Sequence, residues 1–218
     1  MKALAKNGKT YRSFDLSTEC PKRLSGNPCP YCYVEAARKA GFRGKTSCLR
    51  VPYEGEILKL RKSTIERLNR CGGLRFFAFS DYMEWMDEDL MRAIEDSRKV
   101  GLLIKAITKV PEFVEKYHQY FRIINVSIDS LGHGMNWEDA KSLRKSYKNV
   151  LVRSAVMSWE DVDALGWTDI LTLNHGPNGF YHFKRKEKED LVEKYGYKMC
   201  CVTGRCETCT LKCGSPRL

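Results

Sequence analysis

The sequence predicts an α/β fold in which parallel β-strands alternate with α-helices. Short apolar runs alternate with amphipathic segments along the chain, and polar residues directly follow most of these runs. No GxGxxG or GxxxxGK[ST] motif follows any of them, so the usual nucleotide fingerprints of an open sheet are missing. Because right-handed crossovers normally link parallel strands, two architectures fit: an open doubly wound sheet or a partial β/α barrel.

Each element follows from local pattern. The predicted strands are runs rich in β-branched and aromatic residues, at 10–16, 74–79, 102–107, 121–128, 150–156 and 169–173. The predicted helices lie between and after them, at 33–40, 54–71, 87–100, a segment opened by Pro111, 136–147, a segment capped by Ser158, and 184–195. The helix at 54–71 is expected to end at Cys71 because two glycines follow.

Polar side chains stand where five of the predicted strands end. They are Ser80 and Asp81, Thr108 and Lys109, Asp129 and Ser130, Ser158 (which follows Met157), and Asn174 with His175. β/α barrels place their chemistry at the carboxyl ends of the strands. Ser158 is interpreted as a helix cap, and the others favour a functional site at this edge of the sheet.

Length and composition favour one main domain. The chain has 218 residues, of which 43% are hydrophobic and 30% charged, which excludes a disordered chain. No apolar run approaches the roughly 20 residues of a membrane helix, and the first residues lack the apolar stretch of a signal peptide. We expect a cytoplasmic protein with a main domain at 1–183 and a linker helix and cysteine-rich tail at 184–218.

Positive charge is concentrated near the N-terminus. Residues 1–50 hold 11 Lys and Arg against 3 Asp and Glu, which accounts for most of the net charge of +11. Such an excess suits a polyanionic partner such as nucleic acid or a nucleotide. A solubilising surface explains it equally well, since no basic run is long or interleaved with aromatic residues.

The ten cysteines fall into two groups that suggest metal binding. Without a secretion signal, reduced thiols that hold metal explain them better than disulfides do. The first group is Cys20, Cys29 and Cys32, and the second is Cys200, Cys201, Cys206, Cys209 and Cys213; Cys48 and Cys71 lie outside both. Three thiolates on one loop suit an iron–sulfur cluster with one open position, although a zinc ion with Cys48 as fourth ligand remains an alternative.

The tail offers four thiolates for a second metal centre. Cys206 and Cys209 form a CxxC pair with Cys213 close behind, and either Cys200 or Cys201 completes the set. We favour Cys201. Four thiolates suit either zinc or an auxiliary iron–sulfur cluster.

The cysteine loop resembles that of the radical S-adenosylmethionine (SAM) superfamily. Tyr31 precedes the last cysteine of a three-cysteine loop that follows the first strand, although eight residues separate Cys20 from Cys29 where the superfamily usually has three. The segments RFFAFSD at 75–81, IKAITKVP at 104–111 and NVSID at 125–129 are similar, in order, to strand motifs of uncharacterised phage-encoded radical-SAM-like proteins. Those proteins also often end in a cysteine-rich tail.

This resemblance implies a partial (β/α)6 barrel of the radical SAM type with a short cysteine-rich metal-binding segment at its C-terminus. It implies a [4Fe-4S] cluster on the three loop cysteines, with SAM bound to the fourth iron. Tyr31 would lie near the adenine, Ser80 and Asp81 would meet the SAM amino group, and Lys109 would pair with its carboxylate. Ser127 and Asp129 would hold the ribose hydroxyls.

The resemblance also implies an enzyme that takes one electron from a reductant, cleaves SAM and abstracts hydrogen from a substrate. An open barrel would admit a large substrate, and a nucleic acid or nucleotide suits the charge, with a peptide nearly as suitable. His175 and His133 are candidate acid–base groups, but a lone histidine in a glycine-rich loop is more often structural, so the catalytic residues are left open. The alternatives are a non-catalytic, zinc-stabilised nucleic-acid-binding protein and a β/α enzyme with structural zinc and no SAM.

Overall fold

Eight strands form one sheet in the computed structural model, which describes residues 3–7, 11–17, 19–26, 50–78, 80–129, 132–156, 169–173 and 198–200. The strands are β1 (Leu4–Asn7), β2 (Tyr11–Phe14), β3 (Leu74–Phe76), β4 (Ile104–Thr108), β5 (Ile123–Asp129), β6 (Val150–Val156), β7 (Ile170–Leu173) and β8 (Lys198–Cys200). β1 pairs antiparallel with β2, and every later pairing is parallel. All six predicted strands are confirmed as β2 to β7, whereas β1 and β8 are additions to the prediction.

The described helices are α1 (Pro21–Leu24), α3 (Lys62–Arg70), α4 (Asp87–Lys99), α5 (Pro111–Tyr117) and α6 (Trp137–Ser146), with 3-10 turns η2 (Glu84–Met86) and η3 (His118–Tyr120). The helices predicted at 87–100, after Pro111 and at 136–147 are confirmed. Asn136 caps α6, because its side chain accepts hydrogen bonds from the backbone N–H groups of Glu138 at 2.8 Å and Asp139 at 3.5 Å. The helices predicted at 33–40, after Ser158 and at 184–195 lie outside the described residues.

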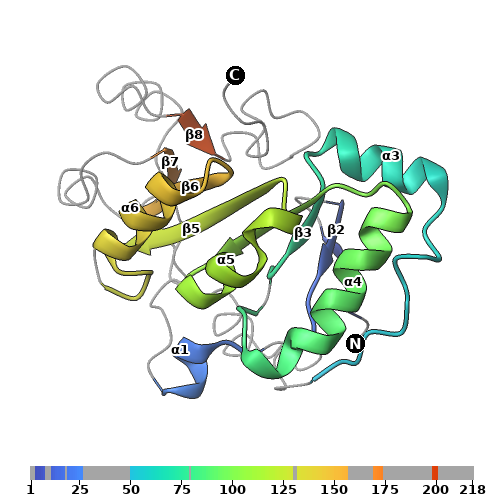
Figure 1. Cartoon of the computed structure of the whole chain (residues 1–218), viewed down its shortest axis with the longest axis horizontal. Helices are drawn as coiled ribbons and strands as arrows, with labels where there is room; N and C mark the ends of the chain where they lie inside the picture. The colour runs from blue at the N-terminus through green and yellow to red at the C-terminus, as the bar shows by residue number, and fades with distance from the viewer. Residues whose placement is uncertain are drawn as a thin grey trace.

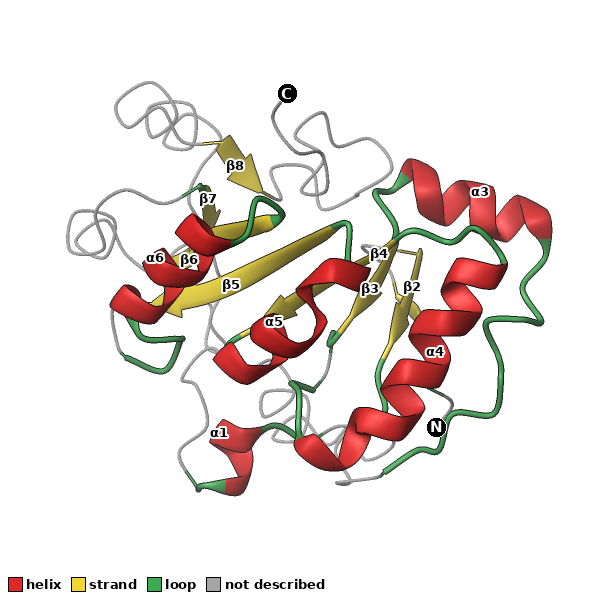
Figure 2. Ribbon diagram, viewed as in Figure 1, coloured by secondary structure: helices red, strands yellow, loops and turns green. Residues whose placement is uncertain are grey.

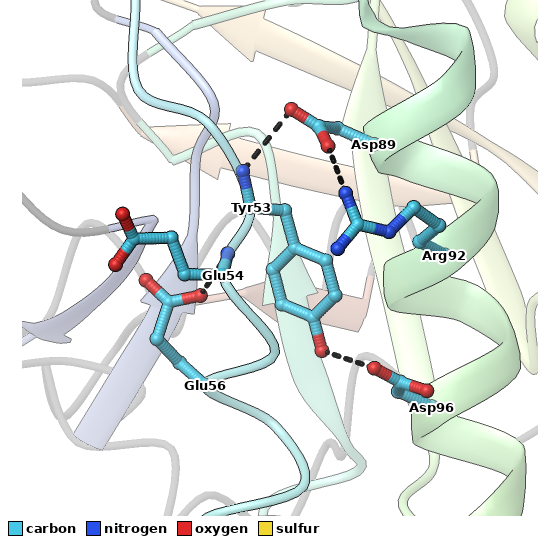
Figure 3. Close-up of polar contacts among 6 residues, drawn as sticks. All are labelled: Tyr53, Glu54, Glu56, Asp89, Arg92 and Asp96. Carbon is cyan, nitrogen blue, oxygen red and sulfur yellow. Dashed lines mark hydrogen bonds and ion pairs between the residues drawn. The ribbon is translucent and has the colours of Figure 1, made fainter.

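The helix predicted at 54–71 is wrong in its first half. The chain turns at 55–59, where Gly55 has φ +74°, and α3 begins only at Lys62. The reason is tertiary: Tyr53 and Ile57 are buried, which holds this segment against α4 (Figure 3). The Tyr53 hydroxyl donates to Asp96 at 2.9 Å, and the Tyr53 backbone N–H donates to Asp89 at 3.1 Å.

The strands follow one another across the sheet in sequence order, from β1 at one edge to β8 at the other. A doubly wound sheet would reverse its order at a switch point, so the described strands exclude that alternative. Right-handed crossovers that always step in one direction leave their helices on one face. Figures 1 and 2 show α4, α5 and α6 together in front of the sheet. The molecule is thus a mixed α/β protein with an open, singly wound sheet.

The hydrophobic core lies between these helices and one face of the sheet. The rings of Phe14 and Phe76 lie 4.4 Å apart on β2 and β3, and Phe76 and Phe113 both meet Phe121 at 5.3 Å. Phe113 belongs to α5, so this row of residues faces the helices. Because side chains alternate along a strand, the residues between them face the other way. No described helix is both long and apolar enough to cross a membrane.

Candidate functional site

The residues that flank the cysteine-bearing segment 20–49 meet at the carboxyl end of β2; we call this segment the cysteine loop. Just before it, Ser17 pairs in an antiparallel bridge with Arg50, and the Val51 N–H donates to the Leu16 carbonyl at 2.8 Å. Arg50 also forms an ion pair with Glu19 at 3.6 Å and lies 4.5 Å from the centre of the Trp85 ring. These contacts hold the two ends of the cysteine loop together.

Of the predicted ligands in this loop, the structure describes Cys20. Cys20 is half-buried, and its carbonyl accepts a hydrogen bond from Leu24 at 3.0 Å, so it directly precedes α1. Cys29, Cys32 and Tyr31 lie outside the described residues, as does Cys48. Within the described part of the chain, no three His, Cys, Asp or Glu side chains come together as a metal site.

Asp15 is a polar residue at the carboxyl ends of the strands that the sequence prediction missed. It is 1% exposed, and its Oδ1 accepts hydrogen bonds from both the backbone N–H and the hydroxyl of Ser80, each at 3.2 Å. β2 ends at Phe14, so Asp15 is the polar residue that follows this strand. The prediction extended the strand to residue 16 and therefore concealed the same signal that identified Ser80 and Asp81.

Asp81 joins the ends of β3 and β4. Its Oδ1 accepts from the Thr108 hydroxyl at 2.6 Å and from the Tyr82 N–H at 2.8 Å, and its Oδ2 accepts from the Lys109 N–H at 2.9 Å. Burial raises the pKa of this carboxyl group, and the three hydrogen bonds offset that rise only in part. Lys109 thus meets Asp81 through its backbone, and its side chain is half-buried.

Ser127 and Asp129 lie two residues apart on β5 and therefore on the same face, and both are buried. The loop that follows folds back over them. His133 donates its backbone N–H to Asp129 Oδ1 at 3.1 Å, and Met135 donates to the Ser127 carbonyl at 2.7 Å. Gly134 permits this approach, since a Cβ there would lie 2.5 Å from the Ile128 Cα.

Backbone strain marks the carboxyl end of β3. Phe77 has φ +60°, which is rare for a bulky residue and costs about 1–3 kcal/mol. Its N–H donates to the Phe14 carbonyl at 3.0 Å, and its ring meets that of Phe113 at 4.9 Å. Strict alternation would turn Phe77 away from the helices. The positive φ instead buries its ring in the core and redirects the chain toward Ser80 and Asp81.

The neighbouring strands β2, β3 and β4 thus bring a set of polar groups together at their carboxyl ends. The described hydrogen bonds join Asp15 to Ser80, and Asp81 to Thr108 and Lys109. No hydrogen bond between described residues joins Ser127 or Asp129 to that group, although β5 is the next strand. Carboxylates and hydroxyls in this arrangement can accept hydrogen bonds from an amine and from sugar hydroxyls.

The tail cysteines lie mostly beyond the described residues. Cys200 is the last residue of β8 and stands in register with Thr172 of β7, whereas Cys201, Cys206, Cys209 and Cys213 are outside. No model of a protein family matches this chain, and no curated protein matches its sequence. The assignment of function therefore depends on the chain's own residues and geometry.

Proposed function

We propose that this protein is a radical SAM enzyme that acts on a large substrate, with a nucleic acid or nucleotide as the expected class. The observation that carries the proposal is the position of the cysteine loop. Both of its ends are held at the carboxyl end of β2, beside the polar residues that follow β3. A cluster bound in this loop would therefore lie close to the groups proposed to hold SAM.

The winding of the sheet supports a barrel-like architecture. Strands that follow in sequence order, with helices on one face, are the arrangement of a β/α barrel, whose reactions occur at the carboxyl ends of the strands. We propose that β2 to β7 form a partial (β/α)6 barrel of the radical SAM type, with the antiparallel β1 added beside β2 and the short parallel β8 added beside β7.

The donor set fits an iron–sulfur cluster. Cysteine thiolates are the usual ligands of such clusters, and Cys20, Cys29 and Cys32 provide three of them. Cys20 is half-buried at the start of the loop, so its thiol is neither sealed in the core nor freely exposed. When bound, the cluster and SAM would supply the one-electron cleavage of a sulfonium bond, which protein side chains cannot perform.

The polar residues at the carboxyl ends of the strands would position SAM through hydrogen-bond acceptors that are already held in place. Asp81 is held in place by three hydrogen bonds, so it can meet an ammonium group with little reorganisation. Ser80 adds a hydroxyl that Asp15 orients, and the Lys109 side chain is proposed to pair with the SAM carboxylate. On the next strand, Ser127 and Asp129 are proposed to bind the ribose hydroxyls, while Tyr31 is proposed to lie near the adenine.

Anaerobic reconstitution tests this proposal. The full chain, reconstituted with iron and sulfide and supplied with SAM and dithionite, should be brown and should release 5′-deoxyadenosine. Cys29→Ala and Cys32→Ala should each lose the cluster absorbance and SAM cleavage. Cys71→Ala is the matched control. Cys71 precedes β3 and Cys20 follows β2, so in this parallel pair they lie at opposite ends of the strands.

Two results would overturn the proposal. The first is full iron content and SAM cleavage in both the Cys29→Ala and Cys32→Ala proteins. The second is a colourless protein that binds zinc but cleaves no SAM after reconstitution, which would favour the zinc-stabilised nucleic-acid-binding alternative.

A further inference from the structure

We propose that Trp85 is a stacking site for an unpaired base of a single-stranded nucleic acid, which is then the substrate class of this protein. The inference deepens the proposed function and rests on it for calling the strand a substrate. Binding of the strand can be measured without SAM cleavage, so the two proposals can fail separately.

Trp85 lies beside the candidate site, on the segment that joins the carboxyl end of β3 to α4. It belongs to η2, which follows Asp81 and leads directly into α4. The Asp81 N–H donates to the Glu19 carbonyl at 3.4 Å, and the Glu19 side chain forms an ion pair with Arg50 at 3.6 Å. The Arg50 guanidinium in turn lies 4.5 Å from the centre of the Trp85 ring. A group bound against Trp85 would therefore lie close to the groups proposed to hold SAM.

The Trp85 side chain is exposed, unlike most of the large aromatic side chains near it in the fold. Trp85 is 37% exposed, whereas Tyr53 and Tyr117 are at most 2% exposed. A single exposed apolar residue is ordinary at a protein surface, so exposure alone does not indicate a binding site. The inference depends on how this ring is held and on the charges around it.

Arg50 holds the Trp85 ring in a fixed position before any ligand arrives. The guanidinium group contacts the ring as a cation–π pair, for which tryptophan is the best partner. Arg50 is itself fixed by its ion pair with Glu19 and by the backbone bridge to Ser17. A side chain that is ordered in the free protein loses little conformational entropy on binding, which increases affinity.

The charges favour a base of a nucleic acid over other flat groups. The net charge of +11 attracts a polyanion, whereas an uncharged sugar or an aromatic side chain gains nothing from it. Glu84 and Glu88 are exposed on either side of Trp85 in the chain, and they would repel a phosphate placed on the ring. The contact at Trp85 is therefore with the uncharged base, and the adjoining phosphate lies toward Arg50.

A single strand suits this site better than a duplex does. Bases of a single strand can be turned outward and stacked on an aromatic side chain, and every base has a flat face that can do so. In a duplex each base is already stacked between its neighbours, so contact with Trp85 would first require its release.

Fluorescence anisotropy of the full chain with a labelled adenine strand of about 12 nucleotides, at low ionic strength and without SAM, tests the inference. The comparison ligand is an abasic strand of the same length, which keeps the phosphates and has no bases. The wild type should bind the adenine strand more tightly than the abasic strand. Trp85→Ala should bind the adenine strand about 5- to 150-fold more weakly and the abasic strand as the wild type does.

Two further variants keep the test decisive. Trp85→Phe retains a ring that can stack and should bind the adenine strand with intermediate affinity, which also serves if Trp85→Ala does not fold. Leu58→Ala is the matched control, since Leu58 is 49% exposed in the turn at 55–59 and should not affect binding. Titrations with DNA and RNA forms show which sugar is accepted, and preference for the adenine strand in either form supports the inference.

The inference is overturned if the wild type binds the adenine strand no more tightly than the abasic strand. It is also overturned if Trp85→Ala binds the adenine strand like the wild type, if it weakens binding of both strands equally, or if Leu58→Ala weakens binding as much. A failure of the proposed function would appear differently, as missing 5′-deoxyadenosine in a protein that still prefers the adenine strand.

Discussion

The Thr108 hydroxyl donates a 2.6 Å hydrogen bond to Asp81 Oδ1, which joins the end of β4 to the segment that follows β3. Asp81 lies 27 residues before Thr108 in the chain, and its other oxygen accepts from the Lys109 N–H. One buried carboxyl group therefore fixes the relative positions of two strand ends at the candidate site.

Asp81→Asn should destabilise the protein by about 1–3 kcal/mol, since an amide nitrogen would face the Lys109 N–H and leave one donor unsatisfied. The loss should depend on pH. Burial raises the pKa of Asp81 in the folded state, so its contribution is fully present below the unfolded pKa of about 3.9 and is lost as pH rises through the folded pKa. The difference between wild type and variant should therefore shrink from pH 4 to pH 8.

Urea denaturation across this pH range measures the Asp81 effect. Glu95→Gln, at an exposed position in α4, is the control and should show little change in the free energy of unfolding at any pH. A difference between wild type and Asp81→Asn that grows with rising pH would contradict the assigned direction of the pKa.

Asp87 should show the opposite pH dependence. Burial alone would raise its pKa, but hydrogen bonds from Lys116, Tyr117 and Tyr82 outweigh it and lower the pKa. Its stabilisation is present above the unfolded pKa of about 3.9 and disappears as pH falls through the folded value. Asp87→Asn should cost about 1–3 kcal/mol at pH 7, toward the lower end because Lys116 is half-exposed.

The Asp87 effect should be constant from pH 5 to pH 8 and diminish below about pH 4. Glu88→Gln is the control, since it removes an acid from the same first turn of α4 at an exposed position. Equal losses in the two variants would mean that the helix dipole, rather than the three hydrogen bonds, accounts for the effect.

Tyr53→Phe should release the 51–60 segment from α4 in part. The phenylalanine ring retains the edge contact with Phe14 at 5.7 Å but loses the hydrogen bond to Asp96, shown in Figure 3. We expect a loss of about 1–2 kcal/mol by thermal or urea unfolding. Tyr120→Phe, at a half-buried position, should lose less than half as much; a loss as large as that of Tyr53→Phe would contradict the role of this hydrogen bond.

Gly134→Ala should destabilise the protein more than Gly132→Ala does. Gly132 has φ +71° but has open space around it, so an alanine there costs about 1–2 kcal/mol of backbone strain. A Cβ on Gly134 would lie 2.5 Å from the Ile128 Cα and 2.7 Å from the Ser127 carbonyl oxygen, which are backbone atoms of β5. We expect about 3 kcal/mol, measured as a shift in Tm. The reverse order would show that the loop can move away from β5.

The tail should hold a separate metal centre that binds no SAM. Four thiolates saturate a tetrahedral zinc ion or all four irons of a cubane cluster, which leaves no open position. Cys206→Ala combined with Cys209→Ala should therefore reduce metal content by one centre, measured by elemental analysis, while SAM still binds. Full metal content in the double variant would contradict this prediction, and so would lost SAM binding with an intact first cluster.

Local pattern alone predicted the strands β2 to β7 and the helices α4 to α6. Alternating apolar residues, the Asn136 cap and Pro111 act within a few residues, so their effect is readable from the sequence. The same reasoning failed at 54–61, where Gly55 and the burial of Tyr53 prevail over an amphipathic pattern. β1 and β8 escaped prediction because LAKN at 4–7 and KMC at 198–200 contain no β-branched or aromatic residue, so only their pairing with β2 and β7 makes them strands.

The sequence by itself determined which polar residues follow which strands, and hence that Ser80, Asp81 and Lys109 would gather at one edge. Only the tertiary structure decided how they meet. In the folded protein Asp81 is buried and accepts three hydrogen bonds, and the chain turns at Phe77. The bridge between Ser17 and Arg50 joins the ends of the cysteine loop. These outcomes depend on contacts between residues far apart in the chain, whose free energy no local pattern contains.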